Sequence, residues 1–269
     1  MDLDLKGKIA LITGSSKGIG AGIARGLARE GAIVIVHGRD PDLTRSVAGQ
    51  IEADGGAAHA ISGDLTDERQ IDAMLAETRT AVGDIEILVN NAGGSGGGSD
   101  WSTTEAAAWA STYDANVLAA MRLAKAVLPP MRHARWGRII NISSLAGLMP
   151  PAVNPDYSAA KAAMLAMSAS MAKAVAAEGI TVNTVSPGTI HSEKLDKAFR
   201  AAARKRNLSP DAPWKEIEAE VLPLFAEVPV GRVGTLDEIA DAIAFLASPR
   251  AAYITGSNLR LDGGMLPTT

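Results

Sequence analysis

The chain has 269 residues, of which 47% are hydrophobic and 21% charged, so it can bury a large core as one domain. Its formal net charge of −4 gives no electrostatic reason to expect nucleic acid or an anionic membrane as a partner. It contains no cysteine, which excludes disulfides, thiol nucleophiles and thiolate metal sites. No apolar stretch approaches a membrane span, and the acidic N-terminus lacks a signal-peptide pattern, so we expect a cytoplasmic protein.

Short runs rich in Val, Ile and Leu alternate along the chain with longer helical patterns. The short runs are near-continuously apolar, which is typical of strands covered on both faces. Strands are expected at 8–13, 32–37, 57–62, 85–90, 137–143, 180–186 and 258–263, and helices at 18–30, 41–54, 67–82, 103–134, 155–178 and 235–247. This order predicts an α/β fold, a single-domain Rossmann-type doubly wound parallel sheet spanning 1–269, with ligands at the carboxyl ends of its strands.

A glycine-rich turn joins the first strand to the first helix, in the sequence ITGSSKGIGAG. Gly14, Gly18 and Gly20 permit positive φ and let a diphosphate approach the backbone at the helix N-terminus. The spacing G-x-x-x-G-x-G differs from the usual dinucleotide fingerprint, and a turn needed only for packing is the structural alternative. The same stretch matches G-x-S-x-G with Ser16 as a hydrolase nucleophile, but only one strand precedes it, which disfavours that hypothesis.

The end of the second strand indicates which dinucleotide is bound. An NAD-binding protein places Asp or Glu there for the ribose 2′-hydroxyl, whereas this chain has Gly38 followed by Arg39. Arg39 and Lys17 together favour a 2′-phosphate, hence NADP(H). Asp40 keeps NAD(H) open as the alternative, if the strand ends two residues later.

Two segments interrupt the alternation of strands and helices. The Gly- and Ser-rich run at 93–99 resembles a flexible linker, but a linker there would split the sheet, so we interpret the run as a loop bordering the substrate entrance. Closure of 94–98 on substrate is one hypothesis and a tolerated insertion is the other. The segment at about 189–231 carries amphipathic helical pieces punctuated by proline, which predicts a substrate lid.

Tyr157 and Lys161 lie four residues apart, so on a helix both side chains project from one face. The side chain of a free tyrosine has a pKa of about 10. A nearby ammonium group favours the phenolate, which would tune the phenol as a proton donor. Spacing alone is also compatible with a surface pair. Ser144 follows the fifth expected strand thirteen residues upstream of the tyrosine.

Five motifs occur in one order: T-G-x-x-x-G-x-G at Thr13–Gly20, N-N-A-G at Asn90–Gly93, Ser144, Y-x-x-x-K at Tyr157–Lys161, and Pro187–Gly188. In order and spacing the chain resembles the classical short-chain dehydrogenase/reductases over nearly its whole length, and particularly their 3-oxoacyl-[acyl-carrier-protein] reductase-like members. The resemblance implies an enzyme that transfers hydride reversibly between NADP(H) and a carbonyl or secondary alcohol. It leaves the substrate open. A dinucleotide-binding regulator without turnover is the alternative from another class.

The resemblance also implies residue roles. Tyr157 would be the general acid in reduction and the base in oxidation, Lys161 would lower its pKa, Ser144 would bind the substrate oxygen, and Asn116 would position a water in the proton relay. A local bond to the backbone is the alternative for Asn116. Asn90 would brace the sheet. The cofactor would contact Gly14, Ser16, Lys17, Gly18, Ile19, Gly20, Arg39, Asp64, Leu65, Asn91, Ala92, Gly93, Tyr157, Lys161, Pro187, Gly188, Ile190 and Ser192. The family often has Thr at the position of Ser192, which keeps the hydroxyl and lacks the methyl group.

The sequence also bears on metals and on partner proteins. The four histidines are scattered and form no helical ligand pair, so no metal is expected. The basic run at 200–207 fits either a solvated lid helix or attraction of an anionic carrier. The helix at 155–178 is small or apolar almost all round, which implies burial on more than one face. The resemblance implies a homodimer or homotetramer built through it.

Overall fold

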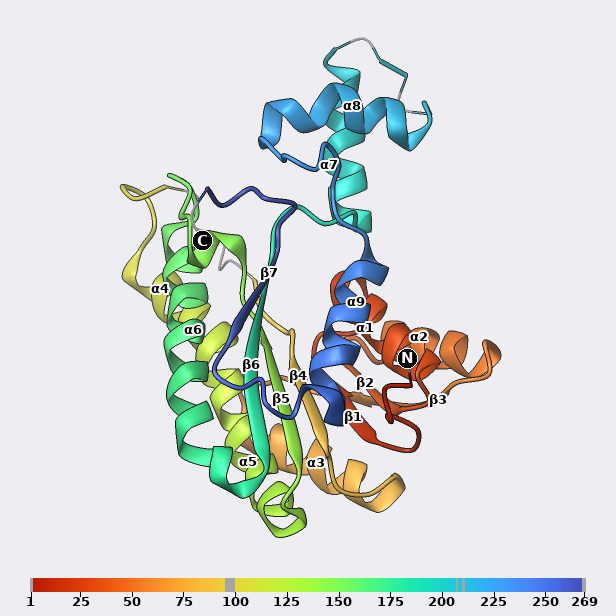
Figure 1. The fold of residues 1–269 in the computed structure, drawn as a ribbon. Helices are drawn as coiled ribbons and strands as arrows, with labels where there is room; N and C mark the ends of the chain where they lie inside the picture. Colours follow the sequence, from red (N-terminus) through yellow and green to blue (C-terminus); the bar gives the residue numbers. More distant parts are fainter. Residues whose placement is uncertain (1, 95–99, 207, 210, 268–269) are drawn as a thin grey trace.

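The structure is a computed structural model that describes residues 2–94, 100–206, 208–209 and 211–267 (Figure 1). Its sheet has the order β3-β2-β1-β4-β5-β6-β7, and every neighbouring pair is parallel. The strands are β1 (Ile9–Ile12), β2 (Ile33–Gly38), β3 (Ala57–Ser62), β4 (Ile87–Asn90), β5 (Gly137–Ile142), β6 (Ile180–Pro187) and β7 (Asn258–Leu261). The predicted α/β doubly wound parallel sheet is confirmed.

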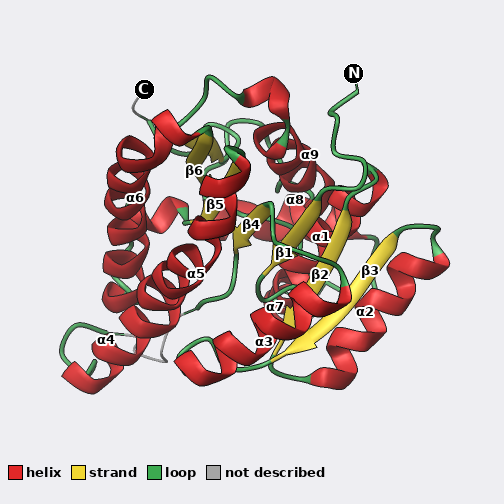
Figure 2. Cartoon of the chain, turned by 90° about the horizontal axis from the view of Figure 1, so that it is seen from below, coloured by secondary structure: helices red, strands yellow, loops and turns green. Residues whose placement is uncertain are grey.

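Helices cover both faces of this sheet (Figure 2). One core cluster joins the sheet to α1 (Gly18–Arg29), α2 (Pro41–Ala53) and α9 (Leu236–Ala247). The other joins it to α3 (Glu68–Ala81), α5 (Ala119–Ala134) and α6 (Pro155–Val175). The central strands β4 and β5 are buried at every position, which explains why their sequences are continuously apolar rather than alternating.

The helix expected at 103–134 begins at Ala106 and is not a regular α-helix throughout. It consists of α4 (Ala106–Tyr113), a π-helical turn at Asp114–Leu118, and α5. Within that turn the Asn116 side-chain amide donates to the Thr112 carbonyl at 2.8 Å. A regular α-helix reserves this carbonyl for the backbone N–H of Asn116, so the side chain competes with the ladder and the turn widens. Such π-turns are frequent at functional sites.

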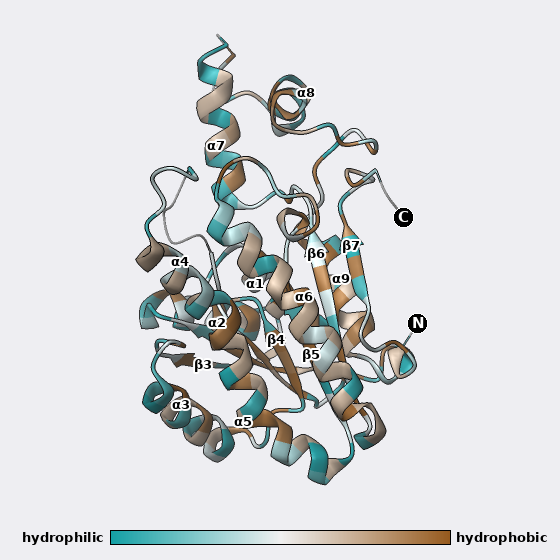
Figure 3. Cartoon of the chain, turned by 90° about the vertical axis from the view of Figure 1, so that its left-hand side faces the viewer, coloured by the Kyte–Doolittle hydropathy of each residue, from teal (hydrophilic) through white to brown (hydrophobic). Residues whose placement is uncertain are grey.

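The predicted lid segment folds into two helices, α7 (Glu193–Arg204) and α8 (Trp214–Phe225), which extend beyond the main body of the protein (Figure 3). They share a small core of their own around the buried side chains of Phe199, Ile217 and Val221. A parallel bridge joins Ile190, at the start of the segment, to Gly234, just beyond its end. No helix among the described residues is long and apolar enough to cross a membrane.

Candidate active site

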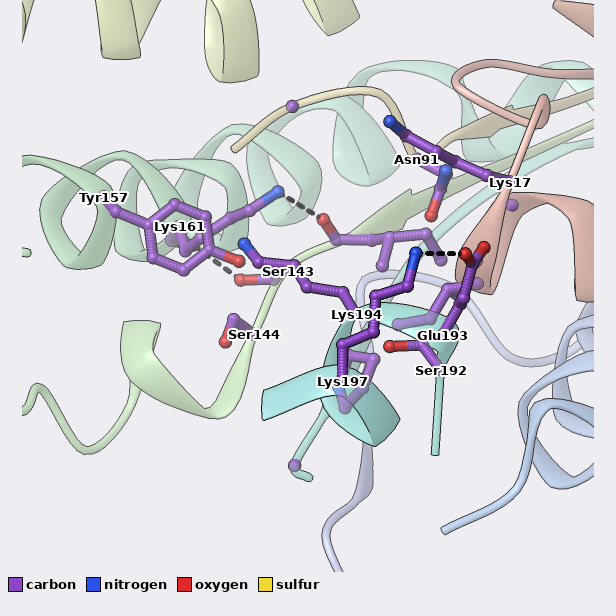
Figure 4. A pocket seen from close by; sticks show the side chains of 17 residues that line it. Lys17, Asn91, Ser143, Ser144, Tyr157, Lys161, Ser192, Glu193, Lys194 and Lys197 are labelled. Atoms are coloured by element: carbon purple, nitrogen blue, oxygen red, sulfur yellow. Dashed lines mark hydrogen bonds and ion pairs between the residues drawn. The ribbon is translucent and has the colours of Figure 1, made fainter. Parts of the chain in front are cut away.

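A cavity of about 610 Å³ opens at the carboxyl ends of the central strands (Figure 4). This is where a doubly wound sheet is expected to bind its ligand. Most of the predicted site residues line it: Lys17, Gly18, Ile19, Gly20, Asn91, Gly93, Ser144, Tyr157, Lys161, Pro187, Gly188 and Ser192. The predicted residues outside its lining are Gly14, Ser16, Arg39, Asp64, Leu65, Ala92, Asn116 and Ile190.

Two glycines of the turn, Gly14 and Gly20, leave no room for a side chain, so a ligand can approach the backbone there. Gly14 has φ +63°, and a Cβ there would lie 2.9 Å from the Ala92 Cα. A Cβ on Gly20 would lie 2.4 Å from the Gly14 carbonyl oxygen and 2.5 Å from the amide nitrogen of Asn91. Asn91 in turn donates to the Thr13 carbonyl at 2.9 Å, so the turns after β1 and β4 are held together. The result is a bare backbone surface at the N-terminus of α1.

His37 braces this turn, and the sequence reasoning gave it no role. Its Nδ1 accepts from the Gly14 N–H at 3.2 Å, and its Nε2 lies 3.2 Å from the Gly63 carbonyl, which makes Nε2 the protonated nitrogen. Burial lowers the pKa of His37 to about 4, so the ring is neutral at pH 7. The available signal was its position at the carboxyl end of β2, the strand next to the glycine turn.

The structure after β2 distinguishes between Arg39 and Asp40, the two residues predicted to contact the ribose. The Asp40 side chain caps α2 by accepting from the backbone N–H groups of Asp42 and Leu43. The strand ends at Gly38, so Asp40 is occupied by the helix and not displaced toward the site. Arg39 is exposed beside Asp64, whose pKa is lowered mainly by hydrogen bonds from Thr66. This arrangement favours Arg39 as the contact to a 2′-phosphate.

Tyr157 and Lys161 lie on the first turns of α6, one turn apart, as predicted. Lys161 is buried and its Nζ donates to the Ile142 carbonyl at 2.8 Å. The same nitrogen lies 5.6 Å from the centroid of the Tyr157 ring. Burial lowers the pKa of Lys161 from 10.5 to about 8.

The expected lowering of the Tyr157 pKa by Lys161 is not what the structure shows. Burial of the phenol raises its pKa, and a hydrogen bond from Ser144 opposes this shift in part. The Lys161 Nζ, 5.6 Å from the centroid of the ring, bonds instead to the Ile142 carbonyl at the end of β5. Tyr157 is therefore a protonated, hydrogen-bonded phenol at neutral pH, which suits a proton donor.

Asn116 does not line the cavity but contacts the loop after β4, which does. Its Oδ1 accepts from the Gly94 N–H at 3.1 Å, and a Cβ on Gly93 would lie 2.3 Å from that oxygen. Thr112 both supplies the carbonyl that holds the Asn116 amide and donates its hydroxyl to the Asp156 carboxyl at 2.6 Å. A chain of contacts thus runs from the residue preceding Tyr157, through α4, to the loop after β4.

Asn90 braces the sheet, as predicted. Its amide donates to the Asn141 side-chain oxygen at 2.8 Å, across β4 and β5. Asn141 donates in turn to the Ser168 hydroxyl of α6 at 2.8 Å. These buried bonds fix β5, the strand that precedes Ser144, against the helix that carries Tyr157.

Several site features lie elsewhere or were missed. Ser192 caps α7, accepting from the Leu195 N–H. The glycine run at 95–99 lies outside the described residues, so closure of 94–98 stays a prediction. In the part of the chain that is described, no group of three or more His, Asp or Glu side chains could hold a metal ion. Sequence reasoning missed five lining residues: Ile142, Ser143, Glu193, Lys194 and Lys197.

The chain is similar to known oxidoreductases over its full length. The family model for short chain dehydrogenases matches residues 8–203. The 3-oxoacyl-[acyl-carrier-protein] reductase of Vibrio cholerae is 39% identical over 263 residues, covering 98% of this chain and 99% of the relative. The enzyme of that name from Escherichia coli is 38% identical with the same coverage. L-Sorbose reductase from Gluconobacter frateurii, solved with NADPH and L-sorbose, has a TM-score of 0.91 at 33% identity, covering 100% of both chains.

Proposed function

The chain belongs to the short-chain dehydrogenase family, and from this premise we propose that it catalyses NADP(H)-dependent, reversible hydride transfer to a carbonyl or from a secondary alcohol. The family resemblance predicted from the five motifs is confirmed. The observation that carries the proposal is the cavity in which Ser144, Tyr157 and Lys161 share walls with the glycine turn.

The residues present fit a dinucleotide. The glycines at positions 14 and 20 leave a bare backbone at the helix N-terminus, which suits a diphosphate. Arg39 is exposed and Asp40 is used as a helix cap, which suits a 2′-phosphate better than a free 2′-hydroxyl. NADPH-complexed L-sorbose reductase supports the same nucleotide. Bound there, the nicotinamide supplies or accepts the hydride.

The protein's own task is to hold the reacting oxygen and move one proton. In reduction, the Ser144 hydroxyl donates a hydrogen bond to the substrate oxygen. As the carbonyl carbon gains hydride, that oxygen takes the Tyr157 proton, and the product is the alcohol. Lys161 packs beside the tyrosine, with its Nζ 5.6 Å from the centroid of the ring, and Asn116 holds the loop at Gly93 and Gly94 in place. Oxidation runs through the same steps in reverse.

We propose 3-oxoacyl thioesters as the first substrate class to test. The support is identity of 35–39% with 3-oxoacyl-[acyl-carrier-protein] reductases over nearly the whole chain. A ketose is the second candidate, because L-sorbose reductase matches the full length of the chain. The first turns of α7 form part of the cavity wall, and we expect this segment to separate these classes.

The test is NADPH oxidation by the purified protein, followed spectroscopically with an acetoacetyl thioester and with L-sorbose. Tyr157→Phe is expected to abolish turnover with either substrate and to leave NADPH binding intact by calorimetry, since binding relies on the glycine turn and Arg39. Normal turnover by this variant would refute the catalytic assignment. Binding of NADPH without turnover of any carbonyl by the wild type would favour a regulator.

We also propose a homodimer or homotetramer assembled through α6. The outward face of this helix carries Ala159, Ala162 and Ala166, all exposed in the single chain. Small residues let a second helix approach closely, and this explains why α6 is apolar on more than one face. Light scattering of the wild type and of Ala166→Arg tests it, because the arginine would convert an oligomer to monomers. Cytoplasmic localisation stays a prediction.

A further inference from the structure

The lid helix α7 begins inside the cavity and brings two lysines to it. Its first turns contribute Glu193, Lys194 and Lys197 to the lining, opposite the glycine turn that carries Lys17 (Figure 4). The proposed proton transfer uses none of these lid residues. In the same view Glu193 and Lys17 lie toward one end of the cavity and Tyr157 lies at the other.

The charges around this entrance do not balance. Three ammonium groups, from Lys17, Lys194 and Lys197, face one carboxylate, that of Glu193. Lys197 donates to Glu193 at 2.5 Å, and this bond is the main reason that the pKa of Glu193 is lowered; Lys17 contributes weakly. Among the described residues, Lys194 forms no ion pair. The wall therefore carries excess positive charge aimed at a space that can hold an anion.

The opposite wall favours an anion as well. The N-terminus of α1 presents Gly18 and Gly20 to the cavity and has no acidic residue in its first turn. The unpaired N–H groups of a helix N-terminus bind phosphate readily. A phosphate between α1 and α7 would thus meet backbone donors on one side and ammonium groups on the other.

We propose that Lys194 and Lys197 form a clamp on the diphosphate of the dinucleotide, closing on it from the lid while the glycine turn holds it from below. This inference rests on the proposed function. Glu193 serves as the partner that Lys197 keeps until the diphosphate replaces it. Because α7 packs within the separate core of the lid, this clamp ties nucleotide binding to the position of the substrate wall.

Calorimetric titration with NADPH and with NADH, at two salt concentrations, tests the clamp. Lys194→Ala/Lys197→Ala is expected to weaken both nucleotides by about tenfold or more, since both contain the diphosphate, and to reduce the salt dependence of binding. Glu193→Gln is expected to tighten both, because it releases Lys197 from its present partner. Lys215→Ala, which removes an exposed lysine of α8, is the matched control and should leave binding unchanged.

The outcomes separate the clamp from other sources of the same anion. Weakening of NADPH alone would assign the lysines to the 2′-phosphate and overturn the clamp. Unchanged nucleotide affinity with a raised KM for an acyl thioester would assign them to the substrate and overturn it too. If the wild type bound neither nucleotide, the proposed function itself would fail, whatever the variants did. Thermal unfolding of each variant checks that the lid still folds.

Discussion

Replacing Lys161 by methionine is expected to stabilise the fold at neutral pH while abolishing catalysis. Burial lowers the pKa of this lysine from 10.5 to about 8, so at pH 7 the folded state disfavours its ammonium by about 3 kcal/mol, at about 1.4 kcal/mol per pH unit. Methionine removes that penalty. It also removes the hydrogen bond from Nζ to the Ile142 carbonyl, worth about 1 kcal/mol. The net expectation is about 2 kcal/mol of added stability at pH 7.

The sign of the pH dependence makes this prediction specific. Between pH 8 and 10.5 the unfolded chain binds more protons at this position than the folded chain, so wild-type stability rises with pH there. Below pH 8 the penalty is fully present, and above 10.5 it vanishes. The advantage of Lys161→Met should therefore shrink as the pH rises from 7 to about 9.5, where about 1.4 kcal/mol of the wild-type penalty remains.

Urea unfolding of wild type and Lys161→Met at pH 7, 8.5 and 9.5 measures the difference, provided that the m-values agree. Lys173→Met, at an exposed position of the same helix, controls for helix propensity. A stability difference that did not change with pH would refute the reasoning, as would a variant less stable than wild type at pH 7. Such a trade of stability for function is common at active sites.

Three further substitutions test separate parts of the site. Arg39→Ala should weaken NADPH far more than NADH in calorimetry, and an equal loss for both would make Arg39 structural. Gly20→Ala should abolish binding of both nucleotides, because its Cβ would lie 2.4 Å from a backbone carbonyl of the glycine turn. Thr112→Val removes the hydroxyl that donates to the buried Asp156 carboxyl, so we expect the free energy of unfolding in urea to fall by about 1–3 kcal/mol. We also expect a lower kcat, because Thr112 holds the Asn116 amide and its displacement would shift Asn116. Thr112→Ser should restore both.

The strands were predictable because parallel strands buried on both faces leave a direct record in sequence. Every residue of β4 and β6 is buried. Both strands are rich in Val and Ile, and their few polar residues are Asn, Thr and Ser. The glycine turn was equally predictable, because glycine is required where a side chain cannot fit. These features are local, and local features are what a single sequence records well.

Tertiary contacts explain the rest. The π-helical turn at Asn116 depends on a side chain that bonds to a carbonyl of its own helix, and an asparagine in a helical pattern does not show in advance that it will do so. The rise in the Tyr157 pKa depends on how deeply the phenol is buried, which only the folded structure shows. Lys194 and Lys197 belong to the cavity only because α7 begins there, and their sequence is that of any solvated helix.

Asp40 illustrates how local demand settles a question about the site. The sequence leaves its carboxylate free either to bind a ribose or to cap the next helix. The cap has the shorter reach, since the N–H groups of Asp42 and Leu43 lie within 2.9 and 3.2 Å of one oxygen. Breaking it to serve a ligand would cost about 1 kcal/mol before any contact to ribose formed. Arg39 makes no such cap, so its side chain is available to a 2′-phosphate. The preference for NADP(H) therefore depends on the capping of α2 by Asp40 as well as on the charge of the phosphate.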